Sequence, residues 1–133
     1  MPNVDTETKA QLVERLTQAF AEATSFPADI FGIRFCFYPW GEAASGGHFS
    51  AEGDERPYLH MLLYSPRLKR KAKVDLVWRF TEEFVAVLKK PAWRPVIHLC
   101  EHPYDNVGVD GQLLSDAYPE LAGRSYYYGL TDD

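Results

Sequence analysis

The sequence predicts an α+β fold in which two tandem β-α-β-type units form a mixed sheet covered by two helices. The first observation is an internal repeat at one constant spacing without a gap, which indicates a duplicated unit. The second is that each helical stretch is followed by a short aromatic or β-branched stretch. Identical residues at the spacing of the repeat include Lys9 and Lys73, Val13 and Val77, Arg15 and Arg79, Phe20 and Phe84, Ile33 and Ile97, Cys36 and Cys100, and Gly47 and Gly111.

Two amphipathic helices are predicted, over residues 6–24 and 69–89. In both stretches apolar residues recur at the three- and four-residue spacing that places them on one helix face. Asp5 or Thr6 can cap the first helix, and Pro27 follows its end. The apolar positions are Leu12, Val13, Leu16, Ala19, Phe20 and Ala23 in the first helix and Val74, Val77, Phe84, Val85 and Leu88 in the second.

Three strands are predicted at residues 33–38, 58–64 and 96–101, where short runs of aromatic and β-branched residues are bounded by prolines. The glycine-rich, polar stretch 41–55 is long enough to be a functional or mobile loop. Its counterpart in the second unit is a turn at residues 105–110. Each unit therefore reads as helix, strand, glycine-bearing turn and strand.

The phase of the repeat predicts that the first unit lacks its opening strand. Met1 aligns with Ser65, so the counterpart of strand 58–64 would lie upstream of the first residue. The tail residues 126–130 have strong strand propensity, and we expect them to occupy the empty sheet position. We expect a single domain over 1–133, with unit one at 1–56, unit two at 57–120 and a C-terminal strand at 121–133.

Composition excludes several classes of function. A net charge of −5 argues against a nucleic-acid partner, because neutralising phosphates requires a basic face. No apolar run is long enough to cross a membrane, and no signal pattern opens the chain, so we expect a cytoplasmic protein with reduced thiols. The basic cluster 67–73 is either a solvated helix start or an anion pocket.

The sequence predicts neither a metal site nor a cofactor. The string from His98 to His102 matches a metalloprotease pattern, but that chemistry requires a helix, and this segment reads as a strand. In a strand the two histidines would lie about 13 Å apart, too far to share one zinc ion. Cys36 and Cys100 lie in apolar strands without a basic neighbour, so we interpret them as buried structural residues rather than nucleophiles.

Two polar residues interrupt apolar strands and are candidates for ligand binding. Arg34 lies on the strand face opposite Ile33 and Phe35, where it needs an anion, a partner chain or solvent. It is therefore a candidate either for binding a carboxylate or for an inter-subunit salt bridge. His60 shares a strand face with Tyr58, and the same alternatives hold for it.

The second unit resembles the tautomerase superfamily, which includes 4-oxalocrotonate tautomerase, cis-3-chloroacrylic acid dehalogenase and malonate semialdehyde decarboxylase. The stretch that opens with Pro57, continues as a strand and reaches Arg67 at the eleventh place is similar to the opening of the family. Residues 106–111 resemble the glycine-rich turn that closes a family unit. The resemblance covers residues 6–115 and places Arg34 on the family's second-strand arginine.

The resemblance implies a catalytic N-terminal proline, with Arg34 and Arg67 binding a substrate carboxylate. Tyr58 and His60, which share a strand face, are further candidates for substrate binding. Pro57 holds the family place but is internal, so its nitrogen is an amide. Pro2 is the remaining candidate catalytic residue, yet it aligns with the far end of the strand, about 30 Å from the expected place and away from the cleft. We therefore expect proline chemistry that is altered or absent.

The function expected from these features is a tautomerase-like, isomerase-class protein with a small-carboxylate site for a 2-oxo acid or its enol. The first alternative is a non-catalytic ligand- or protein-binding module on the same scaffold. The second is a ferredoxin-like dimeric barrel, which shares the β-α-β duplication. The resemblance and a sheet face left bare by helices on one side predict a homo-oligomer, a trimer by analogy with the family.

Overall fold

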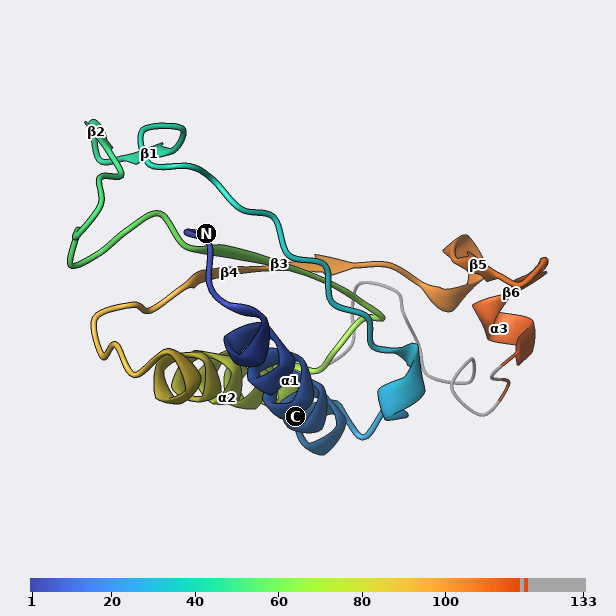
Figure 1. Ribbon diagram of the computed structural model, residues 1–133. Helices are drawn as coiled ribbons and strands as arrows, with labels where there is room; N and C mark the ends of the chain where they lie inside the picture. Colours follow the sequence, from blue (N-terminus) through green and yellow to red (C-terminus); the bar gives the residue numbers. More distant parts are fainter. Residues whose placement is uncertain (118, 120–133) are drawn as a thin grey trace.

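The computed structural model describes residues 1–117 and 119 of the chain, and two long helices and a parallel strand pair form its body (Figure 1). Among these residues no helix is long and apolar enough to cross a membrane. The predicted C-terminal strand 121–133 lies outside the described residues. The elements in chain order are α1 (Thr6–Thr24), η1 (Ala28–Ile30), β1 (Ala44–Ser45), β2 (His48–Phe49), β3 (His60–Ser65), α2 (Arg70–Leu88), β4 (Val96–Glu101), η2 (Tyr104–Asn106), β5 (Gly108–Val109), β6 (Gln112–Leu113) and α3 (Leu114–Ala117).

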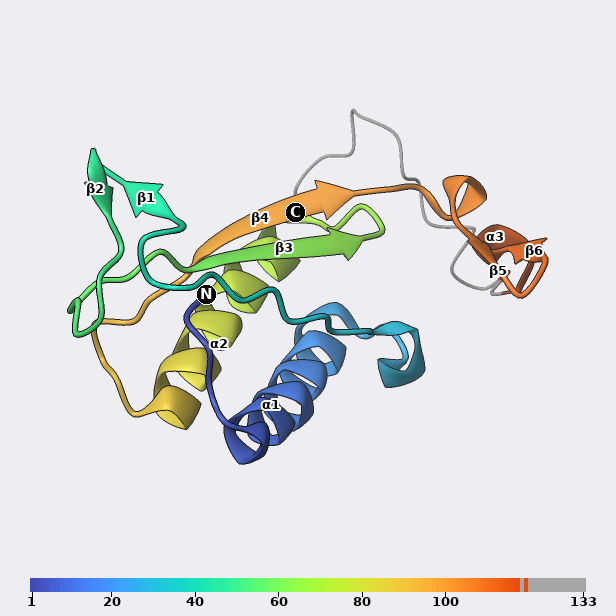
Figure 2. The same cartoon turned by 45° about the horizontal axis from the view of Figure 1, so that its top comes forward.

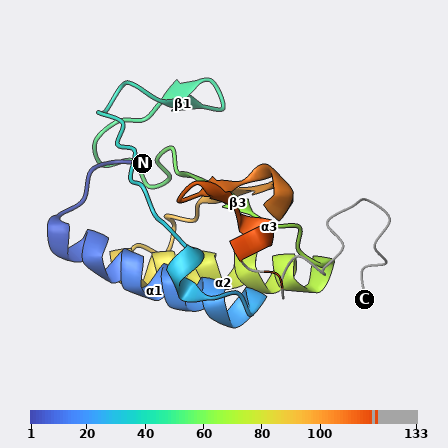
Figure 3. The ribbon, with the colours of Figure 1, turned by 90° about the vertical axis from the view of Figure 1, so that its right-hand side faces the viewer.

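The helices α1 and α2 lie side by side in one layer, and β3 and β4 cover them (Figures 2 and 3). β3 and β4 are parallel, with His60 opposite Val96 and Ser65 opposite Glu101. The core fills the space between the layers, because both helices present their apolar faces to the sheet. Its buried members include Leu12, Phe20, Leu76, Phe80 and Leu63.

Local signals in the sequence explain where the helices begin and end. The Asp5 carboxylate caps α1 by accepting a hydrogen bond from the backbone N–H of Thr8 at 2.7 Å. Ser25 directly follows α1 and Lys89 directly follows α2, and both adopt the left-handed conformation, with φ of 60° and 56°. A residue in this conformation cannot continue a right-handed helix, so the chain turns back toward the sheet.

The two halves of the structure match at the spacing of the sequence repeat. Both ends of α2 are offset from the ends of α1 by this spacing, and the hairpin β5–β6 has the register of β1–β2. The backbone hydrogen bonds match as well. Tyr38 N–H donates to the Met1 carbonyl at 2.9 Å, and His102 N–H donates to the Ser65 carbonyl at 2.7 Å. Met1 therefore occupies the same position relative to the segment 31–38 that Ser65 occupies relative to β4.

Two local predictions differ from the structure. The predicted strand 33–38 is extended and alternates between half-buried and exposed residues, but among the described residues only Met1 bonds to its backbone. It therefore lacks the ladder that defines a strand. The expectation that both cysteines are buried is wrong, because Cys36 is exposed and Cys100 is half-buried. Cys36 shares the parity of Arg34, and both point away from the helices.

Candidate ligand-binding cleft

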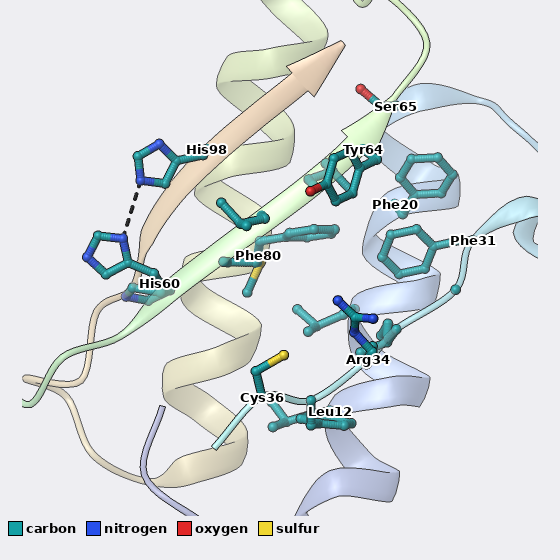
Figure 4. Close-up of a pocket in the computed structure, with 18 of the residues that line it drawn as sticks. Leu12, Phe20, Phe31, Arg34, Cys36, His60, Tyr64, Ser65, Phe80 and His98 are labelled. Carbon is teal, nitrogen blue, oxygen red and sulfur yellow. Dashed lines mark hydrogen bonds between the residues drawn. The ribbon is translucent and has the colours of Figure 1, made fainter. Parts of the chain in front are cut away.

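A cavity of about 1030 Å³ lies between the segment 31–38 and β3. Its floor is the apolar core of α1 and α2, where Phe31 stacks on Phe20 with ring centroids 4.5 Å apart (Figure 4). No backbone hydrogen bond joins 31–38 to β3 within the described residues. The cavity therefore separates two extended segments whose edges face each other. We call it the cleft.

Arg34 brings the positive charge to the cleft. It comes from the segment 31–38, its side chain is exposed, and it lines the cavity together with Cys36 (Figure 4). Within the part of the chain that the structure describes, the Arg34 guanidinium makes no salt bridge or side-chain hydrogen bond. A guanidinium presents a planar fork of donors that matches a carboxylate. The described part of the molecule therefore leaves this fork available to an anion.

His60 lies at the other wall of the cleft, within a row of stacked rings. Its ring stacks on Tyr58 with centroids 4.1 Å apart, and Tyr58 meets Tyr38 edge-on at 5.6 Å. His60 Nδ1 lies 3.3 Å from His98 Nε2 on the neighbouring strand (Figure 4). Partial burial, the neighbouring His98 and the positive chain terminus lower the pKa of His60 below its ordinary value. His60 is therefore a neutral base at neutral pH.

The start of the chain also lines the cleft. The Met1 α-amine donates to the carbonyl of Cys36 at 3.2 Å, and burial lowers its pKa. The α-amine of Met1 is therefore a polar group of the cleft. Pro2 itself is buried, does not line the cleft, and has an amide nitrogen joined to Met1.

The structure brings together some of the predicted site residues and separates others. Arg34, Tyr58 and His60 line one cleft, whereas Arg67 follows the far end of β3 and does not line it. In the basic cluster, Lys73 pairs with Glu101, and residues 69–71 are exposed, which fits a solvated helix start. Arg34 therefore lines the cleft without Arg67.

The structure agrees with the strand interpretation of the histidine string. His98 lies within β4, and His102 follows that strand directly. Among residues 1–117 and 119, no group of three or more His, Cys, Asp or Glu side chains could hold a metal ion. Sequence reasoning missed Tyr38 and His98 as cleft residues. Tyr38 lies an even number of residues from Arg34 along an extended segment, and this shared face could have indicated that Tyr38 lines the cleft. The pairing of His98 with His60 depends on the register of β3 and β4, which the sequence does not show.

No protein-family model matches the chain, and no curated protein is detectably similar to it in sequence. Solved structures do match over nearly the whole chain. Native fused 4-OT superimposes with a TM-score of 0.72 and 22% identity, covering 86% of this chain and 91% of that one. The F6 fused 4-OT asymmetric trimer superimposes with a TM-score of 0.72 and 26% identity, and the match covers 93% of this chain and 95% of that one. N1, a member of the cis-3-chloroacrylic acid dehalogenase family, superimposes with a TM-score of 0.73 and 20% identity, and the match covers 92% of this chain and 85% of that one.

The chain has the tautomerase-superfamily fold. This confirms the predicted resemblance and the predicted α+β class. The tautomerase fold, rather than a ferredoxin-like barrel, is therefore the scaffold that carries the cleft. Among the described residues, a cavity and no strand lies between 31–38 and β3.

Proposed function

We propose that this tautomerase-like protein binds a small carboxylate, such as a 2-oxo acid or its enol, through Arg34 in the cleft. The observation that carries the proposal is the convergence of an exposed guanidinium and a neutral imidazole on one apolar cavity. The guanidinium fits the carboxylate, and the stacked rings of Tyr58 and His60 fit a short carbon chain. Tyr58 and His60 line the same cavity as Arg34.

His60 replaces the family proline as the proton carrier in this proposal. Tautomerisation of a 2-oxo acid breaks one C–H bond at carbon 3, and the proton passes to the ring nitrogen of His60 that does not face His98. The electron pair moves to the carbonyl oxygen, which then takes the same proton back from the imidazolium. Pro2 takes no part, because its amide nitrogen has no basicity.

The experiment combines ligand titration with a turnover assay. Phenylpyruvate is titrated and its tautomerisation followed in the parent, Arg34→Ala, His60→Gln and Arg56→Ala proteins. Arg34→Ala should weaken binding about 10-fold or more, because it removes a charge-assisted hydrogen-bonded pair. Arg56 is exposed and lies outside the cleft lining, so Arg56→Ala is the matched control and should bind as the parent does.

The variant at His60 separates the two candidate functions. Turnover that is lost in His60→Gln while binding persists supports the tautomerase proposal. Binding without turnover in the parent favours the non-catalytic module on the same scaffold. Turnover that disappears in Pro2→Ala but persists in His60→Gln would restore the proline mechanism and contradict our assignment.

We further propose that the protein is a homotrimer. Three of the matched fused 4-OT structures are described as trimers. The sheet face that points away from the helices carries large exposed apolar side chains, among them Leu62, Tyr64 and Val96. An apolar patch of this kind is typical of a surface that another subunit covers.

A further inference from the structure

The two walls of the cleft are extended segments, and their facing backbone edges have no strand between them among the described residues. All residues from 58 to 66 line the cavity, as do residues 31–36 and Tyr38, so the cavity follows both extended segments along their length. β3 pairs with β4 on one side and has no strand partner on the other among the described residues. Backbone groups along an open edge are a template for pairing with another strand.

Met1 fixes the direction that such a strand would have. Its N–H donates to the Cys36 carbonyl at 3.2 Å, and its carbonyl accepts from the Tyr38 N–H at 2.9 Å. These two bonds, to the residues on either side of Phe37, are the pattern of a parallel bridge. A strand that continues this bridge into the cleft runs parallel to 31–38 and antiparallel to β3.

The chain leaves the described region at the end of the cleft where such a strand would begin. Tyr104, Val107 and Leu114 line the cavity. The elements that carry them lie at the far end of β3 from Met1 (Figure 2). Residues 120–133 follow directly, and they outnumber the six residues of β3 more than twofold. The tail is therefore long enough to follow the cleft back toward Met1.

The composition of the tail suits this position. Residues 125–130 read Ser-Tyr-Tyr-Tyr-Gly-Leu, and three consecutive tyrosines favour a strand. Tyrosine suits a strand with one face on an apolar floor and one face open, because its ring is apolar and its hydroxyl is polar. The cleft offers both environments, with Phe20 and Phe80 below and the exposed side chains of Arg34 and His60 above.

We propose that residues 125–130 of the same chain enter the cleft as a strand, parallel to 31–38 and antiparallel to β3, with their end toward Met1. The inserted strand joins the segment 31–38 to β3 and completes a four-stranded sheet. Arg34 and His60 stay on the open face, because their apolar neighbours Phe35 and Leu59 face the core. The inserted strand occupies the apolar floor of the cleft, so a bound carboxylate reaches Arg34 from the open face, beside Tyr58 and His60. Insertion depends on the backbone edges and carboxylate binding on the exposed side chains, so the two are tested separately.

Cysteine scanning in the full-length protein tests the position of the tail. In a Cys100→Ser background, each residue from 126 to 131 is replaced by cysteine in turn, and oxidation to a disulfide with the native Cys36 is measured by peptide mapping. Neighbouring strands lie about 4.8 Å apart, within the range that a disulfide spans. Because strand side chains alternate in direction and a disulfide cannot bridge Cα atoms more than about 7 Å apart, the intrachain disulfide should form mainly at one position, the one directly opposite Cys36.

Other patterns of crosslinking would overturn the proposal. Disulfides between two chains would identify a second copy as the occupant, and equal reaction at all six positions would show that the tail is not a strand. The absence of any disulfide with Cys36 would show that the tail does not enter the cleft.

Amide hydrogen exchange gives a second readout that does not depend on cysteine chemistry. In the parent protein, residues 31–38 should exchange slowly because the inserted strand pairs with them. Tyr127→Pro and Tyr128→Pro remove donors from the strand and should accelerate this exchange about 10-fold or more. The control Asp132→Pro lies beyond the proposed strand and should leave it unchanged. Equal exchange of 31–38 in all four proteins would contradict the insertion.

Discussion

At the scale of the residue, the cleft depends on alternation along extended segments. Arg34 and His60 are exposed because their immediate neighbours Phe35 and Leu59 pack against the core. This alternation is readable from the sequence, which is why both residues could be predicted as candidates. The contact between His60 and His98 was not readable, because it links residues on two strands whose register only the fold defines.

The titration of His60 provides a residue-scale prediction. Partial burial first and the neighbouring His98 second lower the pKa of His60 from its ordinary value of 6.5. His98→Gln removes the second cause and should raise the pKa of His60, as measured by the pH dependence of its ring NMR signals. His48→Gln, on the exposed strand β2, is the control and should leave that titration unchanged. A lower pKa of His60 in His98→Gln would contradict the electrostatic role of the pair.

The same shift has a consequence for stability. A histidine whose folded-state pKa is lowered binds its proton more weakly than in the unfolded chain. The unfolded state therefore gains protons first as the pH falls through 6.5, and the free energy of unfolding decreases. His60→Gln should reduce this loss in denaturant unfolding measured between pH 7.5 and pH 5, whereas an unchanged pH dependence would show that His60 does not contribute.

At the scale of the element, the helices were the most predictable part of the molecule. The three- and four-residue apolar spacing predicted 6–24 and 69–89, and the structure gives Thr6–Thr24 and Arg70–Leu88. The strand prediction for 33–38 was less successful. Aromatic and β-branched composition describes an extended, half-buried segment, but a strand also needs a partner for its backbone groups.

The end of α2 provides an element-scale prediction. Lys89 is exposed and holds a φ of 56°, a conformation that costs an ordinary residue about 1 kcal/mol and glycine almost nothing. Lys89→Gly should therefore raise the free energy of unfolding by roughly 0.5–1 kcal/mol in urea denaturation. The control is Ala86→Gly, at an exposed position inside α2, which should lower that free energy by about 1 kcal/mol. If both variants are destabilised equally, the helix does not end at Lys89.

At the scale of the whole molecule, the residues that the structure describes leave one face of the sheet bare. The helices α1 and α2 cover one face, and the other exposes Leu62, Tyr64 and Val96 at 59%, 66% and 51% (Figure 3). Burying such a surface between subunits is favourable at roughly 25 cal/mol for each Å² of apolar area removed from water. The proposed trimer would supply that burial.

Self-association provides the whole-molecule prediction. Leu62→Glu places a charge on the bare sheet face and should shift the protein toward the monomer in analytical ultracentrifugation at micromolar concentration. Val74→Glu introduces the same charge at an exposed apolar position on α2 and should leave the assembly unchanged. A parent protein that sediments only as a monomer would contradict the oligomer, and equal dissociation in both variants would place the interface elsewhere.

The sequence by itself determined the α+β class, the two helices and the constant spacing at which the halves match, because these depend on local periodicity and on residue identity. Only the tertiary structure decided that Met1 lines the cleft beside Cys36 and that Arg67 lies outside it. Those placements follow from the direction in which two distant segments run past each other. No local pattern carries that information, because it is fixed by the packing of both segments over the shared core of α1 and α2.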